Sequence, residues 1–228
     1  MSSSDVNQVE FPWWRKALTL LGFPIIHGEV KWLDLRVYHV VVVSLLCLIS
    51  IPTLGDRGAI ERFGFVAADP MRDFGITFLT PFFLHAGWFH LLGNLYFLIL
   101  FGNRATLLLS PARYLTLIIG ALVFGNLLHA VFATDPTIPC IGASDAISGI
   151  IAFYCLAVPQ QKMTIFLIFR FITIPAWVFF FFWLGIQVLG FSEQSAGLTD
   201  TSYAAHLGGM LTGLFTWISW KSSGQVHV

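Results

Sequence analysis

The sequence predicts an all-α membrane protein built as a bundle of six membrane-crossing helices. Hydrophobic residues make up 57% of the 228 residues and charged residues only 11%, whereas a soluble domain has about 25% charged residues. The apolar residues also fall into six long runs, and a helix needs about 20 such residues to cross the hydrocarbon core of a bilayer. We therefore expect an integral, multi-pass membrane protein.

The six runs define the predicted helices in chain order. A long loop, residues 55–84, separates the first two, and an apolar connection with Lys162 and Arg170 separates the fourth and fifth. We expect residues 163–174 to lie in the membrane interface, because the Arg170 side chain can snorkel to the headgroups. Pro175 then suits the first turn of the fifth helix. The predicted spans are 37–54, 87–102, 114–132, 143–159, 175–191 and 203–220.

Three parts are expected along the chain: an N-terminal segment over 1–35, a six-helix domain over 36–220 and a cytoplasmic tail over 221–228. The aromatic and leucine-rich stretch 11–31 is either an amphipathic anchor in the interface or a loosely structured tail. The first residues carry an acid before any apolar run, which does not resemble a cleavable signal peptide.

The distribution of basic residues predicts the orientation. Nine of the twelve Lys and Arg residues precede the first span, follow the sixth, or lie between spans two and three or four and five. The other three lie in the first long loop, where acids are more numerous. Both termini are therefore expected in the cytoplasm, and we expect the inner membrane of a bacterium.

In this orientation, spans two, four and six all begin at the outer face. His85, His90 and Asn94 begin span two, Ser144 begins span four, and His206 lies near the start of span six. We expect these five residues to lie at a similar depth in the membrane, near its outer face. Polar and ionisable residues inside a membrane are costly and mark functional sites.

Ser144 and His206 are the predicted nucleophile and base. Ser144 follows Gly142 and Ala143 at a helix start, where free N–H groups and the helix dipole suit an oxyanion. It lies outside a Gly-x-Ser-x-Gly elbow, because residue 146 is Ala. A serine in a membrane helix is more often a packing residue, so the case depends on the histidine.

The spacing around His206 favours close helix packing. Gly209 and Gly213 form a GxxxG face that allows span six to approach span four. This approach would bring His206 within hydrogen-bond reach of Ser144. No Asp or Glu is placed in the sequence to orient the histidine, so we expect a dyad.

His90 and Asn94 lie four residues apart and share one face of a helix, where both can donate hydrogen bonds to an oxyanion. Zinc is an alternative, but Asn is a poor ligand and no His-Glu-x-x-His is present. We expect no metal and no cofactor. Nucleic acid is excluded as a partner, because no basic patch has interleaved aromatics. A haem or metal carrier would use His39, His85, His90, His129 and His206.

The combined motifs resemble those of the rhomboid intramembrane serine proteases over residues 37–220. They are His85-x4-His90-x3-Asn94, Gly142-x-Ser144 and Ala205-His206-x2-Gly209-x3-Gly213, in this order on spans two, four and six. The resemblance implies a six-helix rhomboid-like bundle and a serine endopeptidase with Ser144 as nucleophile and His206 as base.

The resemblance also implies roles for other residues. The oxyanion hole would consist of His90, Asn94 and the N–H groups of Ala143 and Ser144, with His85 in support. Span five, with Trp183, would form a lateral gate, and the first loop would lie partly in the outer leaflet. Single-pass transmembrane proteins would be the substrates, with helix-weakening residues near the cut, since a closed helix presents no accessible scissile carbonyl. A small residue is expected before the cut.

Two positions depart from the family pattern. Asp145 stands where glycine is usual after the serine, and Ser148 where many members have an aromatic residue. A charge facing the oxyanion would oppose catalysis, so we expect Asp145 to face loop or water. The alternative function is a catalytically inactive rhomboid-like protein that binds membrane clients.

Overall fold

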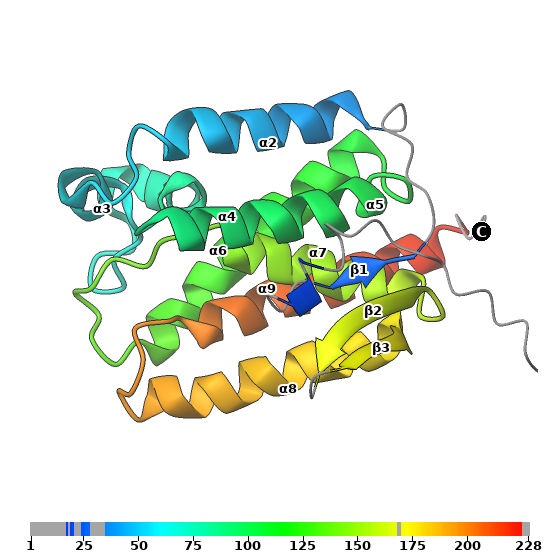
Figure 1. The fold of residues 1–228 in the computed structure, drawn as a ribbon. Coiled ribbons are helices and arrows are strands. Elements are labelled where there is room, and N and C mark those ends of the chain that lie inside the picture. Colours follow the sequence, from blue (N-terminus) through cyan, green and yellow to red (C-terminus); the bar gives the residue numbers. More distant parts are fainter. Residues whose placement is uncertain (1–16, 18, 21–23, 28–34, 168–169, 225–228) are drawn as a thin grey trace, which may run out of the picture.

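A computed structural model describes residues 17, 19–20, 24–27, 35–167 and 170–224. Its long helices form a bundle in which α2 and α8 are the two outer edges in the view of Figure 1. Each predicted span coincides with a helix. These helices are α2 (Val37–Ser50), α4 (Trp88–Phe97) with the π-helical turn η4 (Leu98–Gly102) and α5 (Asn103–Ala105), α6 (Pro111–Phe132), α7 (Ser144–Ala157), α8 (Ala176–Ser195) and α9 (Tyr203–Ser222).

Length and apolar composition differ among these helices. Within the described residues, α6 and α8 are long and apolar enough to cross a membrane, while α2 and α7 are shorter apolar helices of 14 residues each. The count of six membrane crossings therefore stays a prediction. The stretch 11–31, proposed as an interfacial anchor, lies largely outside the described residues.

A small β-sheet corrects the prediction of an all-α fold. The connection over residues 163–174, expected in the membrane interface, contains two strands. β2 (Lys162–Leu167) and β3 (Arg170–Pro175) pair antiparallel, and β1 (Ile25–Ile26) pairs with the other edge of β2. The sheet lies at the end of the bundle where the C-terminus emerges (Figure 1). β-branched residues favour this pairing, and Thr164 and Thr173 face each other with their hydroxyl oxygens 2.9 Å apart.

The sheet leads directly into α8. The backbone N–H of Ala176 donates to the carbonyl of Gln161 at 2.8 Å, and that of Trp177 to the carbonyl of Pro159 at 3.1 Å. These bonds satisfy two of the N–H groups that a helix start leaves free. The first turn of α8 is thus fixed to the chain that leaves α7.

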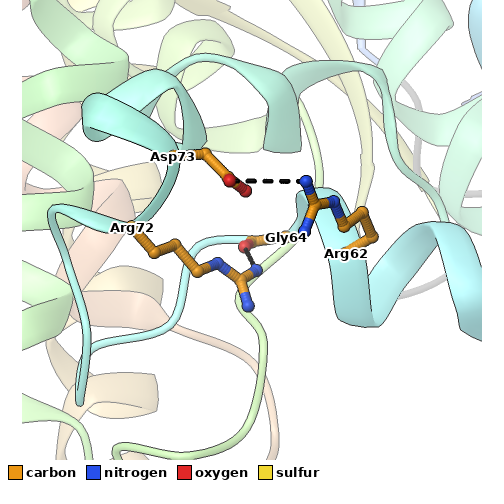
Figure 2. A network of polar contacts seen from close by, with 4 residues as sticks. All are labelled: Arg62, Gly64, Arg72 and Asp73. Carbon is orange, nitrogen blue, oxygen red and sulfur yellow. Dashed lines mark hydrogen bonds and ion pairs between the residues drawn. The ribbon is translucent and has the colours of Figure 1, made fainter.

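The first loop is ordered. It contains α3 (Arg57–Phe63) and the 3₁₀ helices η2 (Arg72–Phe78) and η3 (Thr80–Phe83). Figure 2 shows how α3 and η2 are joined: Arg62 lies 3.4 Å from the Asp73 carboxylate, and Arg72 donates to the Gly64 carbonyl. Asp73 and Phe74 have φ values of 51° and 60°, which is uncommon for L-residues. The turn presents a fully exposed Phe74 ring to the surroundings.

Glycines bring α9 into backbone contact with its neighbours. A Cβ added at Gly209 would lie 2.0 Å from the Asp145 carbonyl oxygen, and one at Gly213 would lie 2.2 Å from that of Gly149, both on α7. On α6, a Cβ at Gly208 would meet the Phe124 carbonyl oxygen at 2.5 Å. Side chains are excluded at these points, so α6, α7 and α9 form the tightly packed centre of the fold.

Candidate active site

Ser144 and His206 lie together at the tight contact between α7 and α9. Ser144 is the first residue of α7 and His206 lies in the first turn of α9. His206 Nε2 is 2.7 Å from Ser144 Oγ. The contact between Gly209 and the Asp145 carbonyl lies next to both residues. The glycine packing therefore brings the hydroxyl and the imidazole, 62 residues apart in sequence, to hydrogen-bond distance.

The other ring nitrogen of His206 is held by Gln187 on α8. His206 Nδ1 lies 2.8 Å from Gln187 Oε1, while Gln187 Nε2 donates to the Trp183 carbonyl at 3.3 Å. An amide oxygen only accepts, so Nδ1 carries the hydrogen and Nε2 of the neutral ring accepts from Ser144. This is the protonation state that a general base needs.

Sequence reasoning missed Gln187 because it searched for an acid to orient the histidine. The available signal was an amide within an otherwise apolar helix. Gln187 is only 2% exposed, and buried polar side chains have hydrogen-bond partners as a rule.

Asn94 is oriented by a chain of hydrogen bonds. Its Nδ2 donates to His85 Nε2 at 2.9 Å, and His85 Nδ1 lies 3.3 Å from Ser50 Oγ. The Ser50 hydroxyl in turn donates to the Phe83 carbonyl at 2.8 Å. Each donor in this series of hydrogen bonds faces an acceptor, so the orientation of the Asn94 amide is fixed. The second N–H of the Asn94 amide does not bond to His85.

Gly142 brings the loop before Ser144 against His90 and Asn94. A Cβ at this position would lie 2.7 Å from His90 Nε2 and 3.6 Å from Asn94 Nδ2. Its φ of 118° also favours glycine. The Gly142 N–H donates to the Pro81 carbonyl at 2.9 Å, which ties this loop to η3. Donor groups of α4 and the start of α7 therefore converge beside Ser144.

A cavity of about 570 Å³ opens at this point. Its walls include Ser144, His206 and three carboxylates, those of Asp135, Asp145 and Asp200. Hydrogen bonds from the Thr137 hydroxyl and N–H hold the pKa of the Asp135 carboxyl below its ordinary value. The polar walls make the dyad accessible to water.

The prediction that Asp145 faces loop or water is wrong. The side chain is 5% exposed and lies against Gly125 of α6, where a Cβ would be 2.8 Å from the Asp145 Cβ. One carboxylate oxygen accepts from the Ala146 N–H at 2.8 Å. The small Gly125 leaves room for Asp145 between the helices. Ser148 is 1% exposed, and its hydroxyl has no hydrogen-bond partner among the described residues.

The five histidines of the metal-carrier alternative do not all lie together: His85 and His90 are neighbours in the candidate site, whereas two others have partners elsewhere. His39 Nδ1 bonds to the Tyr114 hydroxyl at 2.9 Å, and His129 Nδ1 to the Ser202 hydroxyl at 2.8 Å. Within the described ranges, no three His, Cys, Asp or Glu side chains are grouped as metal ligands. This geometry gives the alternative no support.

Comparison with known proteins places the chain in one family. A sequence model of the rhomboid domain matches residues 74–222. The human mitochondrial presenilin-associated rhomboid-like protein is 28% identical over 185 residues, 76% of this chain and 44% of that protein. YdcA of Bacillus subtilis (strain 168), provisionally named a rhomboid protease, is 36% identical over 81 residues, 35% of this chain and 40% of that protein.

The chain thus spans less than half the length of these curated relatives. The match to the rhomboid domain nevertheless covers well over half of the chain. It includes all the residues of the sequence motifs, from His85 to Gly213. The chain belongs to the rhomboid family.

Proposed function

We propose that this rhomboid protein is an intramembrane serine endopeptidase that cleaves transmembrane segments with a Ser144–His206 dyad. The observation that carries the proposal is the 2.7 Å contact between His206 Nε2 and Ser144 Oγ. Ser144 attacks the scissile carbonyl while His206 takes its proton and then returns it to the leaving amine. Water from the cavity hydrolyses the acyl-enzyme, with His206 again as base.

The oxyanion hole consists of His90, Asn94 and the backbone N–H groups of Ala143 and Ser144. Donors aimed at the developing negative charge are among the largest contributions to acyl-transfer catalysis. His85 is a supporting residue, because its hydrogen bond to Asn94 Nδ2 fixes the amide. Ala143 is the residue that immediately precedes α7, so its N–H is one of the groups that a helix start leaves without an internal partner.

Single-pass transmembrane proteins are the proposed substrates. A helix keeps its carbonyls in internal hydrogen bonds, so substrates should have helix-weakening residues near the cut and a small residue before it. Entry between α8 and the bundle agrees with the exposed aromatic face of α8, which includes Trp177 and Phe181. The rhomboid family indicates an integral membrane protein. Its relatives here come from mitochondria and from a bacterium, so the expectation of a bacterial inner membrane has no support.

The test is coexpression with a panel of single-span substrates, with fluorophosphonate labelling of the purified protein. Ser144→Ala and His206→Ala should each abolish cleavage and leave membrane insertion intact. The double variant should be no worse than either single variant, because the two residues act as one unit. Normal turnover by Ser144→Ala would refute the dyad. A wild-type protein that neither cleaves these substrates nor reacts with the fluorophosphonate would support the alternative, a client-binding relative without catalytic activity.

A further inference from the structure

We propose that Gln187 is a positioning residue for His206, and that the alignment of this base depends on the packing of α8 against α9. The proposal rests on the proposed function of the Ser144–His206 pair. Gln187 lies on α8, whereas Ser144 and His206 lie on α7 and α9. A third helix therefore holds the side of the imidazole that faces away from the nucleophile.

The Gln187 amide is fixed at both ends. Its nitrogen donates to the Trp183 carbonyl one turn earlier, and its oxygen accepts from His206 Nδ1. Rotating the amide by 180° would place an NH₂ group against Nδ1–H and a carbonyl against a carbonyl, and both contacts would repel. The side chain is also 2% exposed, so water does not replace either partner. The ring is held in one tautomer and one orientation.

This hydrogen bond gains strength during the reaction. When His206 takes the proton from Ser144, the ring becomes positively charged and still donates Nδ1–H to Gln187. Hydrogen bonds with a charged donor are stronger than neutral ones. An interaction that is stronger in the transition state than in the ground state raises kcat. Gln187 should therefore affect kcat more than KM.

The contacts of α8 with α9 and α4 are made by side chains. The Tyr203 ring fills the space over Gly190, where an added Cβ would lie 2.3 Å from a ring carbon. That ring also lies edge-on to the His206 ring, with centroids 5.7 Å apart. Two turns earlier on α8, Trp183 packs on Phe97 of α4 with centroids 5.4 Å apart.

Helix α8 is also the more exposed of the two long apolar helices. Only 22% of the most apolar 18-residue stretch of α8 is buried inside the protein, compared with 39% of the corresponding stretch of α6. A displacement of α8 would separate Gln187 from His206 while the glycine contacts between α7 and α9 stay closed. The Ser144–His206 distance would be preserved, but the base would lose its fixed tautomer. The base is therefore aligned only when α8 packs against α9, so a substrate that enters between α8 and the bundle is cleaved after this contact has formed again.

The first experiment compares Gln187→Leu and Gln187→Glu with a matched control, Gln194→Leu. Gln194 is also buried on α8 with both ends of its amide bonded, to the Ala204 N–H at 2.9 Å and the Phe132 carbonyl at 3.3 Å. It has no hydrogen bond to His206. Other titratable side chains face His206 or line the same cavity, and they are unchanged in every variant: His90, Tyr203, Asp135, Asp145 and Asp200. Kinetics on a single-span substrate, pH–rate profiles and thermal unfolding are measured for each.

Gln187→Leu should lower kcat by about 10–100-fold, the loss that follows when a metal-bound histidine loses its orienting partner, with little change in KM. Gln187→Glu loses the donor to the Trp183 carbonyl and should lower thermal stability, but it keeps an acceptor for His206 Nδ1 and should retain most activity. The acid limb of its pH–rate profile should move to higher pH because a carboxylate favours the protonated ring. Gln194→Leu should lower thermal stability and keep the wild-type profile. Equal kcat losses in both leucine variants, or an unshifted profile for Gln187→Glu, would overturn the proposal. A wild type without activity would instead refute the proposed function.

The second experiment tests the dependence on α8. Gly190→Ala would place a Cβ against the Tyr203 ring, so that either the ring or α8 must move. Gly185→Ala adds a Cβ to the same helix where no atom lies within 4 Å. Gly190→Ala should lower kcat, and combining it with Gln187→Leu should cost little more than either change alone, because both remove the same contact. Gly185→Ala should match the wild type. Fully additive effects would overturn the coupling to α8.

Discussion

The two interfaces of α9 that meet at His206 are built differently. Toward α7, glycines exclude side chains, and a Cβ at Gly209 or Gly213 would lie 2.0 or 2.2 Å from a backbone oxygen. Toward α8, the contact is made by side chains, among them the Tyr203 ring and the amides of Gln187 and Gln194. A backbone contact has no rotamers to change, while a side-chain contact can be rearranged. The first interface sets the distance between Ser144 and His206, and the second sets the orientation of the His206 ring.

The largest effect is expected where the backbone contact is broken. Gly209→Ala and Gly213→Ala should abolish cleavage and lower the thermal midpoint, since forcing atoms into a packed interior costs about 1–3 kcal/mol or more. Gly185→Ala on α8 is the matched control and should leave the midpoint unchanged or raised, because alanine favours helix by up to about 1 kcal/mol. Thermal unfolding scans measure the midpoint, and cleavage assays measure the activity of each variant. Wild-type stability for Gly209→Ala would contradict the close-approach argument.

An intermediate effect is expected from Asp145, whose side chain fills space beside the same backbone contact. Asp145→Asn keeps an acceptor for the Ala146 N–H and should change stability little. Asp145→Gly removes the acceptor and places a glycine in the first turn of α7, and it should cost about 0.5–1 kcal/mol, the usual cost of glycine within a helix. Both should still cleave, because His206 is bonded to Gln187 and Ser144 and not to Asp145. A rate collapse at every pH would place Asp145 in the catalytic machinery.

The smallest effect is expected on the side-chain interface of α8. The Trp183 indole N–H is buried without a hydrogen-bond partner in the described part of the chain. Trp183→Phe removes this unsatisfied donor, which itself costs free energy, and keeps a ring against Phe97 and Phe179. Stability should stay within about 0.5 kcal/mol of wild type, whereas Trp183→Ala, which removes a half-buried ring, should lose measurably more. Denaturation of both variants tests this, and a large loss for Phe would show that the N–H is bonded.

The helices and the Ser144–His206 pair could be predicted from sequence because their signals are local or strongly constrained. Long apolar runs mark helices, and Gly209 with Gly213 marks a close helix contact. The sheet could not be found in this way. Ile25 pairs with Thr164, and no local pattern joins residues 139 positions apart. Hydrophobic periodicity also does not separate short strands from interfacial helix.

The partners of Gln187 and Asp145 could not be predicted from the sequence, for a different reason. The role of Gln187 follows from the rotation of α8 about its axis, which decides whether the amide faces His206 or lipid. The burial of Asp145 follows from Gly125 on another helix, which leaves space for it. Both depend on tertiary packing, and neither residue type indicates its partner.

The sheet at the start of α8 fixes that end of the helix through backbone hydrogen bonds, whereas the far end is held to α9 and α6 by the side chain of Gln194. The strands and the backbone bonds of Ala176 and Trp177 hold the first turn of α8, so rotation is centred there. Gln187 lies eleven residues farther on, about 17 Å at 1.5 Å per residue. A tilt of about 10° would therefore move Gln187 by about 3 Å, comparable with the full length of its 2.8 Å bond to His206. Small rotations at the sheet are amplified into engagement or release of the base.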